Sequence, residues 1–100
     1  MKHISTQLNK AFDSRVRLGL MSVLIANDEV DFLRMKELLD VTDGNLASHV
    51  TALEKVEYIA VFKQFVGKKT QTTYKITELG RKAFAEHLDA LETIIRGKFS

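Results

Sequence analysis

Apolar residues in the first part of the chain recur at intervals of three and four, which is the spacing of one face of an α-helix. Ile4, Leu8 and Phe12 follow this spacing and predict a short helix over residues 5–12. The same periodicity continues further along and predicts a second helix over residues 15–27. The second helix is apolar on two sides, so we expect it at the centre of the core or at a subunit contact.

Two shorter amphipathic segments follow, separated by a few residues that favour a turn. The first begins at Leu33 and ends near Asp40, and the second follows the turn Val41–Gly44. Thr42 suits the N-cap of the second helix, because its hydroxyl can accept a hydrogen bond from a free backbone N–H. Residues 33–57 therefore predict a helix-turn-helix, an arrangement that other α-rich proteins also contain.

The pattern changes to period two over residues 58–76. β-Branched and aromatic residues are abundant there, and Gly67 can take the positive φ of a turn. This predicts a hairpin with its turn over residues 66–70, followed by a long helix over residues 78–96. The order of elements is that of a winged helix-turn-helix. We expect an α+β fold that is mainly α, in a single domain over residues 1–100, with a β-hairpin wing and with N- and C-terminal helices for dimerisation.

The composition excludes several classes of function. With 100 residues, 45% hydrophobic and 28% charged, the chain has the length and composition of one globular domain. It contains no cysteine, which excludes disulfides, thiolate metal sites and cysteine nucleophiles. No apolar run reaches the roughly 20 residues of a membrane span, and no leader-like segment opens the chain. We therefore expect a cytoplasmic protein without a membrane partner.

Charge is distributed unevenly along the chain, although the formal net charge is only +2. Residues 1–27 have a formal charge of +3, and residues 28–43 have one of −4. Residues 58–77 contain four lysines and no carboxylate, which indicates a local basic surface on the predicted hairpin. A solvated lysine face without a partner would give the same count, so charge alone leaves the role of the hairpin open.

Seven short segments, spread from the first short strand to the last helix, carry a family resemblance. They are Val30–Leu33, Leu38–Leu39, Thr42–Val50, Leu53–Glu54, Phe65–Lys69, Thr72–Tyr74 and Ile76–Arg81. Together they resemble the MarR/ArsR-like winged-helix transcriptional regulators. The resemblance implies a small homodimer that binds operator DNA and represses or activates a promoter. Glu57 departs from the family pattern, which commonly has glycine there, so the left-handed helix cap expected of glycine is in question.

The second helix of the predicted pair is the candidate recognition helix. In a helix-turn-helix, exposed residues near its N-terminus reach base edges in the major groove. The residues in these positions are Asn45, Ser48, His49 and Ala52, with Thr51 and Lys55 placed to contact sugar or phosphate. Asn45 can pair with adenine, and His49 can donate to guanine or to phosphate, although an ordinary surface histidine would show the same pattern.

Basic residues supply the other candidate DNA contacts. Those of the wing, which can straddle the backbone or enter the neighbouring minor groove, are Lys63, Lys68, Lys69 and Gln71. Arg15 and Arg17 are candidates for further phosphate contacts, and Thr42 lies where free N–H groups of a helix start can bind phosphate. For Arg17, a salt bridge with the acidic residues 28–43 is the open alternative.

The last predicted helix carries apolar residues at intervals of four and three, the spacing of a helix–helix interface. Together with two residues of the first helix they form the expected dimer interface: Ile4, Leu8, Phe84, Leu88, Leu91 and Ile95. A two-fold dimer would present two recognition helices to a palindromic DNA site. The alternative is that this seam folds back onto its own domain.

The sequence therefore predicts a sequence-specific regulator of transcription that binds double-stranded DNA as a repressor, with no cofactor and no metal. Catalysis is not expected, because His3, His49 and His87 lie far apart and no glycine-rich phosphate loop or nucleophile motif is present. The main alternative is a winged helix that binds another protein, which the weakly charged recognition helix and the acidic residues 28–43 would also suit.

Overall fold

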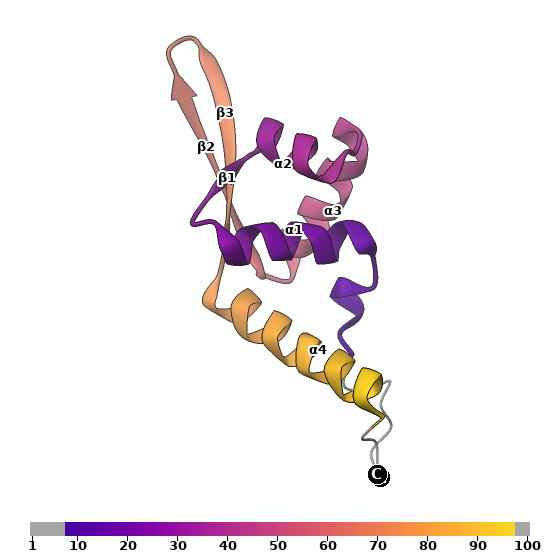
Figure 1. Cartoon of the computed structure of the whole chain (residues 1–100). Helices are drawn as coiled ribbons and strands as arrows, with labels where there is room; N and C mark the ends of the chain where they lie inside the picture. The colour runs from indigo at the N-terminus through magenta and orange to yellow at the C-terminus, as the bar shows by residue number, and fades with distance from the viewer. Residues whose placement is uncertain (1–7, 98–100) are drawn as a thin grey trace.

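The computed structural model describes residues 8–97, which form a three-stranded sheet and four α-helices (Figure 1). In chain order the elements are the 3-10 turn η2 (Lys10–Phe12), α1 (Arg15–Ala26), β1 (Val30–Asp31), α2 (Phe32–Leu39), α3 (Asp43–Lys55), β2 (Ile59–Val66), β3 (Lys69–Ile76) and α4 (Glu78–Arg96). The hairpin of β2 and β3 extends beyond the helices at one end, and α4 leaves its root on the other side of α1. The predicted winged-helix fold is confirmed.

The periodicity of the sequence predicted the long helices closely. The helix expected over residues 78–96 is α4, with the same bounds. The helix expected over residues 15–27 is α1, which ends one residue earlier. Ser14 caps it, because its hydroxyl accepts from the backbone N–H of Arg17 at 3.4 Å. These helices are specified by patterns that lie within their own segments.

An α-helix was predicted over residues 5–12, and for the residues of this range that the structure describes, the prediction is wrong. Only Lys10–Phe12 is helical there, as a single 3-10 turn, and the first three residues of the predicted helix lie outside the described chain. Asn9 explains the difference. Its side chain accepts from the N–H of Ala11 at 2.9 Å, and its own N–H donates to Nδ1 of His87 in α4 at 3.0 Å. A contact with a distant helix therefore sets this conformation.

β3 lies at the centre of the sheet and pairs antiparallel with β1 and with β2. Tyr74 of β3 is opposite Val30 on one side and Val61 on the other, and it is buried. The hairpin turn is tighter than the predicted residues 66–70, since only two residues join the strands. Gly67 takes a φ of 66° at the first of them, where such a turn favours glycine.

One continuous core takes residues from every element. Its buried members are Phe12, Leu20, Met21, Leu24, Val30, Met35, Leu46, Val50, Leu53, Ile59, Tyr74, Ala83 and Phe84. The ring of Phe12 lies 5.3 Å from that of Tyr58 and 5.2 Å from that of Phe84, between centroids. Aromatic pairs at this spacing contribute about 1 kcal/mol each beyond their burial. The short turn η2 is thereby fixed to the root of the wing and to α4.

The chain reverses between α3 and the wing at Glu57, which has a φ of 63°. The N–H of Glu57 donates to the carbonyl of Glu54 at 2.9 Å, and the N–H of Tyr58 donates to the carbonyl of Leu53 at 3.0 Å. This is the hydrogen-bond pattern of a Schellman motif. The left-handed cap is therefore present, although the residue that adopts it is glutamate and not glycine.

Replacing Glu57 by glycine should stabilise the protein, because a side chain in the left-handed region is strained and glycine is not. We expect Glu57→Gly to raise the free energy of unfolding by about 1 kcal/mol in urea denaturation. Glu57→Ala is the matched control, since it removes the same charge but keeps the strained backbone, and it should change stability little. An equal gain in both variants would contradict the backbone explanation.

Candidate nucleic-acid interface

α3 turns an apolar face to the core and a polar face to solvent. Leu46, Val50 and Leu53 are buried on the inner side. On the outer side, the predicted recognition residues that are exposed are Asn45, Ser48, Thr51 and Lys55. Ala52 and His49 are half-buried at the edges of this surface. The structure thus places the predicted residues of α3 along one accessible side of the helix.

The start of α3 is capped by Thr42, as predicted. Its hydroxyl accepts from the N–H of Asn45 at 3.1 Å. Asp43, in the first turn, pairs with Lys36 of α2 at 2.7 Å between the ammonium and a carboxylate oxygen. This pair partly offsets the negative charge that would otherwise repel a phosphate from the positive end of the helix dipole.

The far half of the hairpin carries exposed lysines without an acidic partner. Lys63, Lys68 and Lys69 are exposed, and none of them is within ion-pair distance of a carboxylate of the described chain. Lys75, nearer the root, differs, because its ammonium lies 3.7 Å from a carboxylate oxygen of Glu29. The unpaired positive charge of the wing is therefore concentrated toward its tip.

An exposed aromatic residue on the wing was missed by the sequence reasoning. Phe65 is 81% exposed. It continues the face of β2 that carries Val61 and Lys63, past the point where the helices cover the sheet. Strict alternation could have identified its face, but only the structure shows how far the wing extends beyond the core.

The side-chain amide of Gln71 makes hydrogen bonds within the fold. Its side-chain nitrogen donates to a carboxylate oxygen of Asp31 at 3.4 Å, and its oxygen accepts from the side chain of Gln64 at 3.2 Å. Asp31 in turn caps α2 by accepting from the N–H of Arg34 at 2.8 Å. Gln71 therefore links the wing to the start of α2, and its amide nitrogen keeps a second N–H, so the DNA contact of Gln71 stays a prediction.

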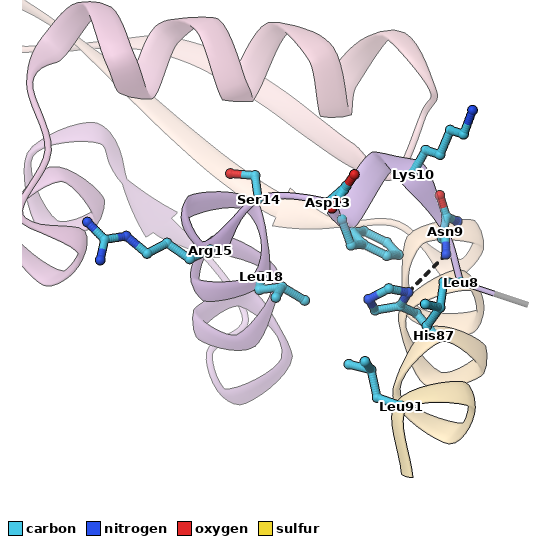
Figure 2. Close-up of a pocket in the computed structure, with 10 residues that line it drawn as sticks. Leu8, Asn9, Lys10, Asp13, Ser14, Arg15, Leu18, His87 and Leu91 are labelled. Carbon is cyan, nitrogen blue, oxygen red and sulfur yellow. Dashed lines mark hydrogen bonds between the residues drawn. The ribbon is translucent and has the colours of Figure 1, made fainter. Parts of the chain in front are cut away.

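The two candidate arginines of α1 differ. Arg15 is exposed, and its guanidinium points away from α4 (Figure 2). Arg17 donates from Nε to Nδ1 of His49 at 2.9 Å and from a terminal nitrogen to the carbonyl of Ala11 at 3.4 Å. It makes no ion pair with residues 28–43, so the predicted alternative of a salt bridge there is wrong. Burial and the charge of Arg17 lower the pKa of His49, which favours its neutral form.

The apolar residues predicted to form an interface along α4 differ in their burial. Phe84 is 3% exposed and belongs to the core of its own chain, as the fold-back alternative expected, so it has almost no surface left for a dimer interface. Leu88 and Ile95 are 46% and 82% exposed. The buried residues of α4 continue from Gly80 to Ala90, so Leu88 is exposed beside buried neighbours and Ile95 lies beyond the last of them. Ile4 lies outside the described residues.

A cavity of about 520 Å³ lies between η2, the start of α1 and α4. Figure 2 shows Leu8, Leu18 and Leu91 around it, together with the ring of His87, whose Nδ1 accepts the hydrogen bond from Asn9. Leu8 and Leu91, predicted at the dimer interface, are therefore half-buried in the wall of this cavity.

Comparison with known proteins identifies the domain. Residues 16–95 match the family described as winged helix DNA-binding domain. The chain belongs to this family. The uncharacterized protein MJ0432 of Methanocaldococcus jannaschii is 34% identical to the winged-helix domain over 79 residues, which are 79% of this chain and 86% of that protein.

Solved structures resemble this winged helix over nearly its whole length. A transcriptional regulator homologue from Pyrococcus horikoshii OT3 is 28% identical, with a TM-score of 0.82 over 92% of this chain and 91% of that chain. Sco3205, a MarR family transcriptional regulator from Streptomyces coelicolor solved in complex with DNA, is similar in fold, at 17% identity and a TM-score of 0.67 over 97% of this chain and 70% of that chain. The matched family is a DNA-binding domain, and the two solved structures are of a transcriptional regulator homologue and of a transcriptional regulator.

Two features are absent from residues 8–97 of the winged helix. No helix in this range has the length and apolar character needed to cross a membrane. No cluster of three or more histidine and carboxylate side chains in the same range is arranged to hold a metal ion.

The two described histidines should make the stability of the winged-helix domain depend on pH. Burial lowers the pKa of His87, although the Asp13 carboxylate opposes part of this shift, and burial with Arg17 lowers the pKa of His49. Both groups bind protons more tightly in the unfolded chain. The free energy of unfolding is therefore highest above the unfolded pKa of about 6.5. It decreases as the pH falls below that value, because the unfolded chain then binds more protons than the folded one.

We expect the urea concentration at the midpoint of unfolding to be lower at pH 5.5 than at pH 7.5. His87→Asn keeps an acceptor near the position of Nδ1 but cannot titrate. This variant should be less stable than the natural protein at both pH values, because a smaller side chain leaves space in the core, but the difference between the two pH values should shrink. An unchanged difference would contradict the assignment to His87.

Proposed function

We propose that this protein is a sequence-specific repressor of transcription that binds double-stranded DNA, with α3 in the major groove and the wing on the backbone or in the adjacent minor groove. The observation that carries the proposal is the group of exposed lysines, Lys63, Lys68 and Lys69, on a hairpin that extends past the helix pair (Figure 1). Such a surface binds a polyanion by releasing its condensed counterions. A protein bound over a promoter can repress by occupancy alone.

Affinity and discrimination come from different elements in this proposal. The exposed side of α3 has an amide at Asn45, a hydroxyl at Ser48 and no arginine. An amide that pairs with adenine contributes about 1–3 kcal/mol of discrimination between bases. The lysines of the wing contact phosphates, which are the same in every sequence, so they add affinity without specificity.

The acidic residues 28–43, which the alternative of a protein partner would use, are partly paired within the chain. Glu29, Glu37 and Asp43 pair with basic side chains of the same chain. Asp31 caps α2. Half of the six carboxylates of this segment are therefore paired, while Asp28 and Asp40 are exposed without an ion pair in residues 8–97. The lysines of the wing tip have no such partners in the same range.

Removing two lysines of the wing tip should weaken binding to every DNA sequence. We expect Lys68→Ala/Lys69→Ala to reduce the slope of log K against log salt by about 2, because two phosphate contacts are lost. Fluorescence anisotropy with a labelled duplex over a salt series measures this slope. The matched control is Arg81→Ala/Lys82→Ala, which removes two exposed charges from α4 and should leave the slope unchanged.

Two outcomes would contradict the proposed function. Absence of duplex binding by the natural protein at low salt would favour the protein–protein alternative. Equal slopes for the natural protein and the Lys68→Ala/Lys69→Ala variant would remove the wing from the interface.

A homodimer on a palindromic operator completes the proposal. Leu88 and Ile95 are exposed apolar residues seven positions apart, so they lie on one face of α4. Leu88 is accessible beside the buried residues His87 and Ala90, and Ile95 lies beyond the last buried residue of the helix. Pairing of these faces about a two-fold axis would remove them from water and present two copies of α3 to two half-sites separated by about 34 Å or a multiple of it.

Charge placed on this face should dissociate the dimer. We expect the natural protein to sediment as a dimer at micromolar concentration and Leu88→Glu/Ile95→Glu to sediment as a folded monomer, because two carboxylates per subunit would be buried without partners. Leu79→Glu, at an exposed apolar position at the other end of α4, is the control and should remain dimeric. A monomeric natural protein would contradict this part of the proposal.

A further inference from the structure

The hydrogen bond between Arg17 and His49 joins α1 to the outer side of the recognition helix. Nε of Arg17 lies 2.9 Å from Nδ1 of His49, with the guanidinium as donor. A guanidinium keeps all its protons at any physiological pH and has no acceptor. Nδ1 must therefore be the unprotonated nitrogen of the ring.

This contact determines the chemical form of the imidazole. A neutral histidine with a free Nδ1 lone pair carries its proton on Nε2. In residues 8–97, Nδ1 is the only atom of this ring with a hydrogen-bond partner. Burial and the charge of Arg17 both lower the pKa of His49, and Arg17 is the charged group that acts on it. The ring is therefore a neutral donor and not a cation.

Arg17 is itself held in place from the N-terminal side. A terminal nitrogen of its guanidinium donates to the carbonyl of Ala11 at 3.4 Å. The N–H of Ala11 is bound by the side chain of Asn9, and the backbone N–H of Asn9 is bound by His87 of α4. The guanidinium thus has a second anchor outside α3, so its position does not depend on His49 alone.

We propose that Arg17 is a positioning residue for DNA recognition: it fixes His49 as a neutral donor whose Nε2–H reads an acceptor on a base edge, N7 or O6 of guanine. This inference rests on the proposed function, because it requires α3 to face the major groove. It replaces the phosphate contact that the sequence suggested for Arg17 with an indirect role. A base pair that presents an amino group at the same place would be rejected, because two donors would meet.

The tautomer can be measured in the free protein. In long-range 1H–15N correlation spectra at pH 7, we expect the natural protein to show His49 as the neutral Nε2–H tautomer. Arg17→Met should give a mixture of both tautomers and a pKa of His49 closer to 6.5, the ordinary value. Arg15→Met, which removes the same charge from an exposed position two residues away, is the control and should leave the spectrum of His49 unchanged.

The role in reading DNA needs variants that separate the two ring nitrogens. His49→Asn keeps an acceptor near Nδ1 and lacks the distal donor, whereas His49→Gln keeps a donor near Nε2 and lacks the acceptor for Arg17. Duplexes selected from a random pool, with each base pair then substituted in turn, report discrimination. We expect His49→Asn to lose about tenfold of discrimination at one guanine, His49→Gln to lose less, and Arg17→Met to lose more than Arg15→Met.

The two experiments can fail separately. An Nδ1–H tautomer in the natural protein, or the same spectrum after Arg17→Met, would overturn the positioning role without any reference to DNA. Full discrimination in His49→Asn, or equal discrimination in Arg17→Met and Arg15→Met, would overturn the reading role. If the natural protein shows no base discrimination at all, the proposed function fails and the reading role with it, while the spectra still decide the tautomer.

Discussion

The reversal of the chain at Glu57 and Tyr58 is the constraint on which the rest of the structure depends. The carbonyl of Glu57 accepts from the hydroxyl of Thr77 at 2.7 Å, and the carbonyl of Tyr58 accepts from the N–H of Thr77 at 3.1 Å. Gly80 of α4 lies so close to the Tyr58 carbonyl that a Cβ would not fit there. The hydroxyl of Tyr58 accepts from the side chain of Asn9 at 2.9 Å. α3, the wing, α4 and the N-terminal segment are thus fixed at one point.

This junction determines what the wing can do. Ile59 and Tyr74 are buried at its root, and its far half is exposed from Phe62 to Thr70. The angle between α3 and the hairpin is therefore set by packing and hydrogen bonds, while the lysines at the tip are exposed and, in the proposed complex, can follow a phosphate backbone. A fixed angle reduces the ordering that binding requires, and flexible side chains at the tip tolerate differences in groove shape.

Sequence reasoning succeeded where the determinants are local. The apolar periodicity of α1 and α4, the Thr42 cap and the period-two hairpin all reside within their own segments, so their bounds were predicted to within a residue or two. It failed where tertiary contacts decide. The 3-10 turn at η2 depends on His87, seventy-eight positions from Asn9. Phe84 has the spacing of a surface seam but lies in the core, because its ring packs against that of Phe12.

In the candidate site, too, local features could be predicted from the sequence and tertiary contacts could not. The exposed side of α3 follows from helical geometry, so the residues on it could be predicted, and so could the unpaired lysines. The partners of polar side chains could not, because Arg17 and His49 are thirty-two positions apart and Gln71 and Asp31 are forty apart. Pairings at such distances depend on how helices and strands pack, and a single sequence does not record them.

The central claim is that α3 and the wing tip form one DNA-binding surface. Its most direct test is a titration of the uniformly 15N-labelled protein with a selected duplex, observed as changes in assigned amide signals. We expect the largest changes in residues 43–52 and 63–69, and small ones in the acidic segment between Asp28 and Asp40. Changes confined to that acidic segment or to α4, with α3 and the wing unaffected, would contradict it.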